Sequence, residues 1–98
     1  MDTSKYIEII NQSILTINST LNDRDKIELI DEDRQEDMVI KLDSLGLVNF
    51  FFDLESRLSR ELKKDVSLLN ENFYEKPEKI LRSFESLLKY IKDQLHEE

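Results

Sequence analysis

The stretch that decides the fold is DSLGLVNFFFDLESRLSREL, residues 43–62. On a helix that turns about 100° per residue, its core-facing side chains fall within an arc of about 80°. These side chains are Leu47, Phe51, Leu54, Leu58 and Leu62. Asp43 is a residue type preferred at helix N-caps, and Lys63 and Lys64 suit the negative end of a helix. The stretch predicts an amphipathic helix over 44–62 whose opposite side, with Asp53, Arg57 and Arg60, faces water.

Apolar residues at steps of three and four predict two further long helices. The first covers 4–21 and is capped by Asp2, Thr3 or Ser4. Its stripe comprises Ile7, Ile10, Ile14, Ile17 and Leu21. The last helix covers 77–95 and begins with Pro77, a residue tolerated in a first turn. Its stripe comprises Ile80, Phe84, Leu87, Leu88, Ile91 and Leu95.

Two shorter segments complete a single all-α domain over 1–98. Residues 22–42 lack strong periodicity and predict a long polar loop, which its apolar residues fasten to the core. A loop of this length without secondary structure is uncommon and is often functional. Residues 70–75 predict a short helix. Tyr6, Tyr74 and Tyr90 lie near the apolar stripes and are expected at the edge of the core.

The composition excludes most other classes. One Gly and one Pro in 98 residues leave little material for the tight turns of β architectures. The absence of Cys excludes disulfide scaffolds and thiolate zinc sites, and the single His96 excludes paired-histidine catalysis. No apolar run approaches the roughly 18 residues of a membrane span, and no signal peptide pattern is present. A cytoplasmic protein is therefore expected.

The charge favours some partners and disfavours others. The formal net charge of −8 opposes binding to nucleic acid and favours partners with basic docking patches. Residues 22–43 hold nine acidic and four basic side chains, so this segment carries −5 of that charge. A solvated acidic run is the expected role of these carboxylates. Counted from Asp31, the run lacks the glycine and the final acid of an EF-hand, so no such metal site is predicted. An enzyme is not predicted either, because the composition does not supply a polar catalytic pocket.

One short constellation stands apart, Asp43-Ser44-Leu45. Here the acidic loop ends, an N-cap aspartate appears, and a serine occupies the first helical position. A phosphate ester on that serine would gain roughly 0.3–1 kcal/mol from the positive end of the helix dipole. The tripeptide alone would occur by chance in about one of 30 chains of this length. The position of the tripeptide, after a long acidic loop and at the start of a long helix, favours a functional motif over a chance occurrence.

At these residues the chain resembles the acyl carrier protein family, including the peptidyl and D-alanyl carriers. The matching run is Leu42-Asp43-Ser44-Leu45-Gly46-Leu47-Val48, and a weaker match covers 70–95. The resemblance implies a four-helix bundle with three long helices, one short helix and a long acidic first loop. It also implies a 4′-phosphopantetheine arm on Ser44, attached by a phosphopantetheinyl transferase. The arm would carry an acyl or aminoacyl thioester between partner enzymes, and the carrier would be a monomer.

A recognition surface is expected beside Ser44. Leu45, Val48 and Phe52 form an apolar patch away from the core stripe, bordered by Asn49, Glu55 and Ser56. Asn49 and Ser56 occupy positions where many fatty-acid carriers have acids, which favours a dedicated pathway over the housekeeping one. An unmodified acidic module that binds a partner through the same patch is the alternative.

Overall fold

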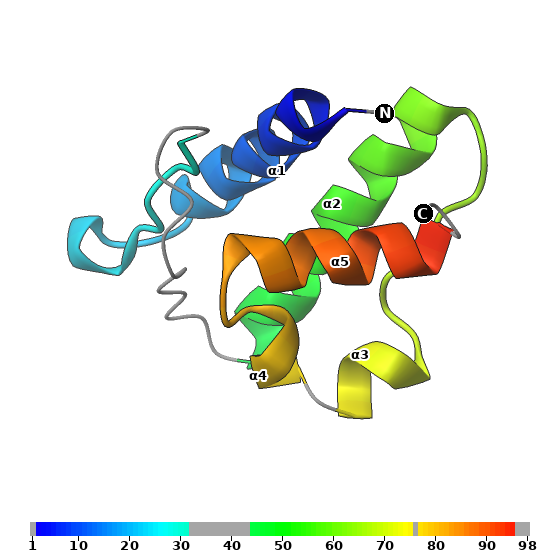
Figure 1. The fold of residues 1–98 in the computed structure, drawn as a ribbon. Coiled ribbons are helices and arrows are strands. Elements are labelled where there is room, and N and C mark those ends of the chain that lie inside the picture. Colours follow the sequence, from blue (N-terminus) through cyan, green and yellow to red (C-terminus); the bar gives the residue numbers. More distant parts are fainter. Residues whose placement is uncertain (1, 32–43, 76, 96–98) are drawn as a thin grey trace.

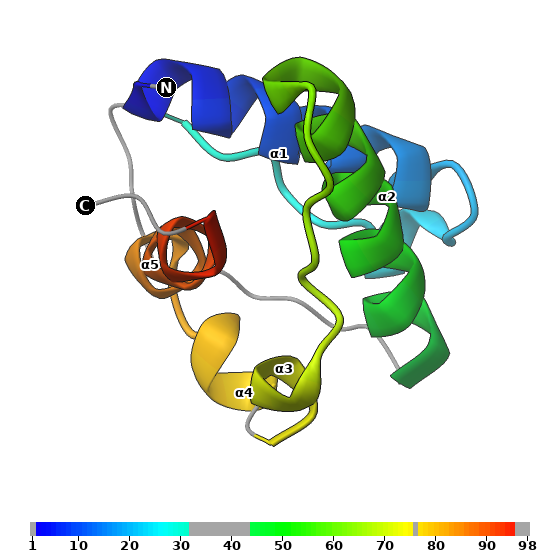
Figure 2. The ribbon, with the colours of Figure 1, turned by 90° about the vertical axis from the view of Figure 1, so that its right-hand side faces the viewer.

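The computed structural model describes residues 2–31, 44–75 and 77–95 of the chain. In chain order the elements are α1 (Thr3–Asn18), the 3-10 helix η1 (Asp23–Asp25), α2 (Ser44–Leu62), α3 (Glu71–Glu75), α4 (Pro77–Ile80) and α5 (Phe84–Leu95). These described ranges hold no strand, so the expected all-α class is confirmed. Figures 1 and 2 show α1 and α2 on one side of the core and α5 on the other, with α3 and α4 below α5. The arrangement is compatible with a helical bundle.

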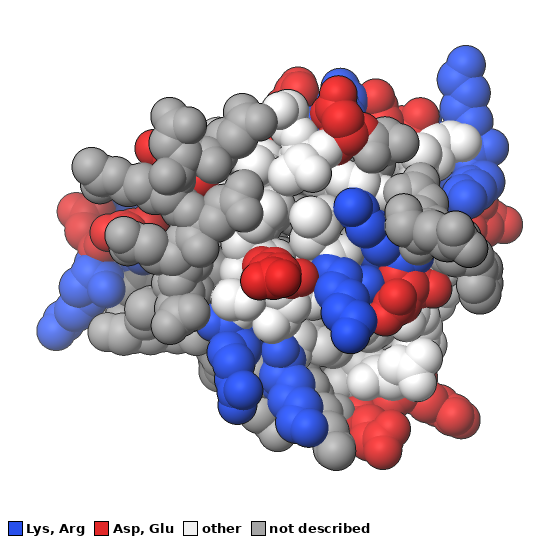
Figure 3. Space-filling view, viewed as in Figure 1, with Lys and Arg blue, Asp and Glu red and all other residues white. Residues whose placement is uncertain are grey.

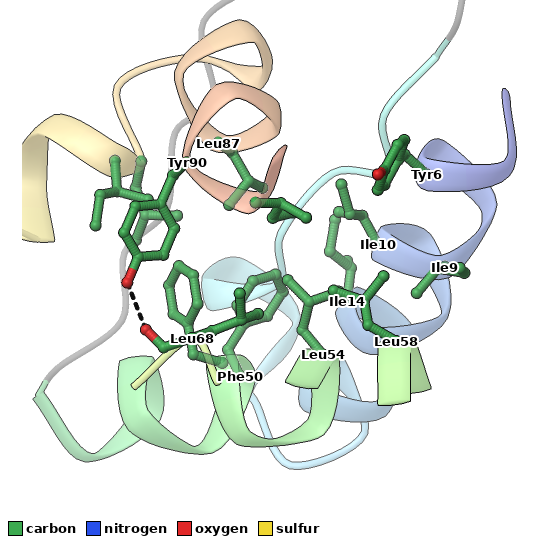
Figure 4. Close-up of a cluster of buried hydrophobic side chains, with 14 of the residues drawn as sticks. Tyr6, Ile9, Ile10, Ile14, Phe50, Leu54, Leu58, Leu68, Leu87 and Tyr90 are labelled. Atoms are coloured by element: carbon green, nitrogen blue, oxygen red, sulfur yellow. Dashed lines mark hydrogen bonds between the residues drawn. The ribbon is translucent and has the colours of Figure 1, made fainter. Parts of the chain in front are cut away.

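Buried side chains from the α-helices form one hydrophobic cluster. Figure 4 shows Ile10 and Ile14 of α1 facing Leu54 of α2, with Leu87 of α5 opposite them. The ring of Phe51 in α2 lies 4.7 Å from that of Phe73 in α3 and 6.3 Å from that of Tyr90 in α5. Burial of this apolar surface is the main force that holds the helices together.

The predicted core stripe of α2 is confirmed and is wider than expected. Phe51, Leu54 and Leu58 are fully buried, and Leu47 and Leu62 pack partly buried against the cluster. Phe50 is also fully buried, although it lies outside the predicted arc. The reason is that α2 has neighbours on more than one side, so a single stripe underestimates the face it buries.

The first helix begins as predicted and ends earlier. Asp2 is the N-cap, because its carboxylate accepts the N–H of Lys5 at 2.9 Å. The helix ends at Asn18 instead of residue 21. The hydroxyls of Ser19 and Thr20 donate to the carbonyls of Thr16 and Ile17, at 2.6 and 2.7 Å. Such side-chain bonds compete with the continuing helix.

The prediction of one helix over 77–95 is wrong, because the chain breaks between α4 and α5. The hydroxyl of Ser83 accepts the N–H of Ser86 at 3.1 Å and so caps the start of α5. Leu81 and Phe84 on either side of this cap are both buried. Apolar spacing therefore continues through the break and hides it. The informative feature in the sequence was Ser83 itself, a preferred N-cap residue.

Two asparagines of α1 hold the segment that follows it. The side chain of Asn18 exchanges two hydrogen bonds with the backbone of Ile27, at 2.8 and 2.9 Å. The side chain of Asn11 does the same with Ile30, at 2.7 and 2.9 Å. Seven residues of helix rise about 10.5 Å, and three extended residues span about 10 Å, so the two pairs match in length. The segment therefore runs antiparallel to α1, and we call these contacts the asparagine clamp.

The clamp explains how the first part of the predicted loop is fastened. Ile27 is buried and Ile30 packs partly buried against the core, as expected of apolar residues in this segment. Leu29 between them is exposed. The remainder of the predicted loop, residues 32–42, lies outside the described residues.

Candidate functional site

Ser44 is the first residue of α2, and the helix has the predicted bounds, Ser44–Leu62. The positive end of the helix dipole therefore lies at residue 44, where a phosphate ester would be favoured. The predicted N-cap, Asp43, lies outside the described residues. The resemblance assigned the attachment of the arm to Ser44, and that assignment stays a prediction.

The apolar patch predicted next to Ser44 lies at the surface. The side chains of Leu45 and Phe52 are 69% and 61% exposed. Val48 is half-buried, Asn49 is exposed, and half-buried Ser56 donates its hydroxyl to the carbonyl of Phe52 at 3.0 Å. Leu45 and Phe52 lie seven residues apart, so they are two turns apart on one side of α2. The recognition role of these residues stays a prediction.

Asp53 and Arg57 were predicted to face water, and the structure shows that both are instead partly buried. Arg57 Nε lies 2.7 Å from Asp53 Oδ2, and both side chains are only about a quarter exposed, at 24% and 25%. The guanidinium also donates to Gln12 and Thr16 of α1, at 3.2 and 2.8 Å. The prediction fails because α1 packs along this side of α2 and supplies acceptors for the guanidinium. Arg60 is exposed, as predicted.

Glu55, one of the predicted recognition residues, bonds within the chain. Its Oε2 accepts the backbone N–H groups of Leu68 and Leu69, at 2.8 and 3.3 Å. The carboxylate thereby satisfies two donors in the segment between α2 and α3. Sequence reasoning missed this role because the partners are 13 and 14 residues away and outside any helix. Glu55 is accordingly assigned to the scaffold of the site.

Tyr90 joins α5 to the same segment. Its hydroxyl donates to the carbonyl of Leu68, which Figure 4 marks with a dashed line. Burial, and secondarily the charge of Glu55, raise the pKa of Tyr90 to about 12. Tyr6 is buried and Tyr90 nearly so, as expected, whereas Tyr74 is 61% exposed and its predicted place at the core edge is wrong.

A groove of about 280 Å³ lies between α1 and α2, and its charged side chains are largely paired. Lys5 Nζ lies 3.2 Å from Glu61 and 3.7 Å from Glu8, and these two carboxylates raise the pKa of Lys5. The guanidinium of Arg57 forms an ion pair with the carboxylate of Asp53. Because opposite charges are matched within it, the groove has no strong preference for an anion or a cation.

The face over α5 carries charges of both signs. Figure 3 shows basic and acidic side chains interspersed there. Residues 77–95 contain four basic side chains against three acidic ones: Lys79, Arg82, Lys89 and Lys92 against Glu78, Glu85 and Asp93. The acidic excess of the chain therefore does not come from this region. A basic partner would be attracted elsewhere, as the charge of 22–43 already indicated.

No protein-family model, no curated protein and no solved structure matches the chain. Among the residues described by the structure, no three His, Cys, Asp or Glu side chains are grouped as a metal site. None of the described helices combines the length and the apolar character needed to cross a membrane. The assignment of the site thus depends on the residues of this chain.

Proposed function

We propose that this protein is an acyl or aminoacyl carrier of a dedicated biosynthetic pathway. Its cargo would be held as a thioester on a 4′-phosphopantetheine arm attached to Ser44. The observation that carries the proposal is the Asp43-Ser44-Leu45 motif at the very start of α2. The exposure of Leu45, the residue that follows Ser44, supports it. The protein would act as a cytoplasmic monomer.

The chain itself would contribute one reacting group, the hydroxyl of Ser44. A phosphopantetheinyl transferase would deprotonate the Ser44 hydroxyl, whose oxygen attacks the pyrophosphate of coenzyme A. A phosphodiester to Ser44 forms, and adenosine 3′,5′-bisphosphate leaves. The chain contains no cysteine, so the thiol that bears the cargo belongs to the arm. The dipole of α2 would favour the phosphate, and partner enzymes would perform every turnover.

The proposal is tested by intact mass. Co-expression with a broad-specificity transferase should add the mass of one phosphopantetheine group to the wild-type chain. Ser44→Ala should abolish the increase, and Ser67→Ala, a matched change at an exposed serine outside α2, should retain it. An unchanged wild-type mass, or an increase that survives in Ser44→Ala, contradicts the proposal.

The exposed pair Leu45 and Phe52 also suits a second function, an unmodified helical module that binds a partner protein. In that case Ser44 would carry nothing. A complex that forms equally well with Ser44→Ala, from a chain that is unmodified in its own host, would favour this function over the carrier.

A further inference from the structure

The segment held by the asparagine clamp leaves part of its backbone unbonded. The segment is extended from Lys26 onward, where φ is −65° and ψ is 143°. The clamp uses the N–H and C=O groups of Ile27 and Ile30. No hydrogen bond joins the backbone of Glu28 or Leu29 to any of the described residues. These N–H and C=O groups can therefore pair with a second extended chain, as the edge of a sheet does.

Two exposed leucines lie beside this backbone. Leu15 of α1 is 56% exposed and Leu29 is 50% exposed. Leu15 comes four residues after Asn11 and three before Asn18, so it lies on the clamped side of α1, between the two clamp pairs. Leu29 belongs to the extended residues that span the same interval. The two leucines therefore lie at about the same level along the axis of α1, and we call Leu15, Glu28 and Leu29 the clamp face.

Leu15 lies between two sides of α1 that are already covered. Gln12 and Thr16 face α2, since both accept hydrogen bonds from Arg57, at 3.2 and 2.8 Å. At about 100° per residue, they lie roughly 60° and 100° from Leu15 on one side of the helix. The clamp asparagines lie roughly 40° and 60° from it on the other side. The exposed strip between them is open to a partner.

The charge of this region is negative. Residues 22–31 hold four acidic side chains against two basic ones, and residues 32–43 add five against two. Lys26 forms an ion pair with Asp23 at 3.0 Å, whereas exposed Glu28 has no ion-pair partner among the described residues. Residues 77–95 have a small basic excess instead. Charge complementarity therefore favours a basic partner at the clamp face.

We infer that the clamp face binds an extended segment of a partner protein in which basic and apolar residues alternate. The backbone of that segment bonds to the N–H and C=O groups of Glu28 and Leu29, in the manner of strand addition. Neighbouring side chains of an extended chain point to different sides. The side with Leu29 therefore takes apolar residues, the side with Glu28 takes basic ones, and Leu15 adds apolar surface. This binding does not involve Ser44 and goes beyond the proposed function.

The test uses a short synthetic peptide in which lysine and leucine alternate, and its Kd for the full chain is measured by fluorescence anisotropy. Leu15→Ser and Leu29→Ser should each weaken binding by about tenfold, as truncated interface anchors do. Glu28→Gln should weaken it by about threefold through the loss of a surface ion pair. Leu45→Ser and Glu85→Gln are matched controls at an exposed leucine and an exposed carboxylate of other helices, and both should leave the Kd unchanged.

Strand addition is tested separately, through the backbone of the peptide. In an extended peptide the leucine N–H groups lie along one edge and the lysine N–H groups along the other. Methylation of one set of nitrogens should abolish binding, and methylation of the other set should not. The bound peptide should also slow hydrogen exchange of the Glu28 or Leu29 amide. A peptide of the same composition with helical spacing should bind more weakly.

Several results would overturn the inference. They are a wild-type chain that does not bind the peptide, a loss in Leu45→Ser as large as that in Leu15→Ser, and equal binding of a peptide with glutamate in place of lysine. Unweakened binding of both methylated peptides, or tighter binding of the helical one, overturns the extended occupant. Ser44→Ala should bind the peptide as wild type does, so the clamp face and the carrier function can fail independently.

Discussion

Replacing Asn18 with alanine should lower the free energy of unfolding by about 1.5 kcal/mol. The substitution removes two hydrogen bonds, at 2.8 and 2.9 Å, that join Asn18 to the backbone of Ile27. A typical intramolecular hydrogen bond contributes about 1 kcal/mol net, and here the two bonded backbone groups are left without their partner. Alanine recovers about 0.5 kcal/mol through its higher helix propensity. Subtracting this gain from the contribution of the two hydrogen bonds, about 2 kcal/mol together, gives the expected loss.

Urea unfolding measures this loss as a lower midpoint with an unchanged slope. Asn22→Ala is the matched control, because Asn22 is exposed and makes no capping hydrogen bond to η1. Amide hydrogen exchange supplies an independent measurement, since the N–H of Ile27 should be protected in wild type and exchange faster in Asn18→Ala.

The double variant Asn11→Ala/Asn18→Ala tests whether the clamp acts as a unit. Its loss should be smaller than the sum of the two single losses, because either change frees part of the same segment. The reasoning is refuted if Asn18→Ala is as stable as Asn22→Ala, or if the Ile27 amide of wild type exchanges without protection.

Three further changes test other details. Lys63 has a positive φ of 54° just after α2, where the backbone N–H of Lys64 donates to the carbonyl of Ser59. Glycine adopts a positive φ without steric cost, so Lys63→Gly should raise the free energy of unfolding by about 0.5–1 kcal/mol. The control Lys64→Gly should not raise it. Ser13→Ala should raise the urea midpoint, because the buried Ser13 hydroxyl has no partner among the described residues; a lower midpoint would contradict this. Tyr90 should ionise near pH 10 in the unfolded chain and near 12 in the folded one. Its contribution to stability should therefore be constant below pH 10 and fall between pH 10 and 12; Tyr90→Phe, compared with Tyr74→Phe by unfolding at several pH values, should remove this loss.

Much of the fold follows from local patterns. The bounds of α2 and the core positions Phe51, Leu54 and Leu58 were predicted correctly, and the N-cap of α1 is Asp2, one of the three residues predicted for it. Each depends on residues within a turn or two of one another. The break before Ser83 was missed because the apolar spacing on both sides of it satisfies a single continuous helix.

The same distinction between local patterns and distant contacts applies to the candidate site. The sequence alone located the motif at Ser44 and the exposed pair Leu45 and Phe52, because helical spacing separates these residues from the core stripe. It could not show that Arg57 reaches α1, or that Glu55 binds the segment after α2.

The sequence by itself determined the helical class, the bounds of α2 and the residue types beside Ser44. Only the tertiary structure decided which polar groups are used internally and which remain for a partner. The asparagine clamp, Arg57 and Glu55 all bond to groups between nine and 45 residues away. Helical periodicity is a property of neighbours in the chain, whereas these bonds form only after packing has brought distant donors and acceptors together.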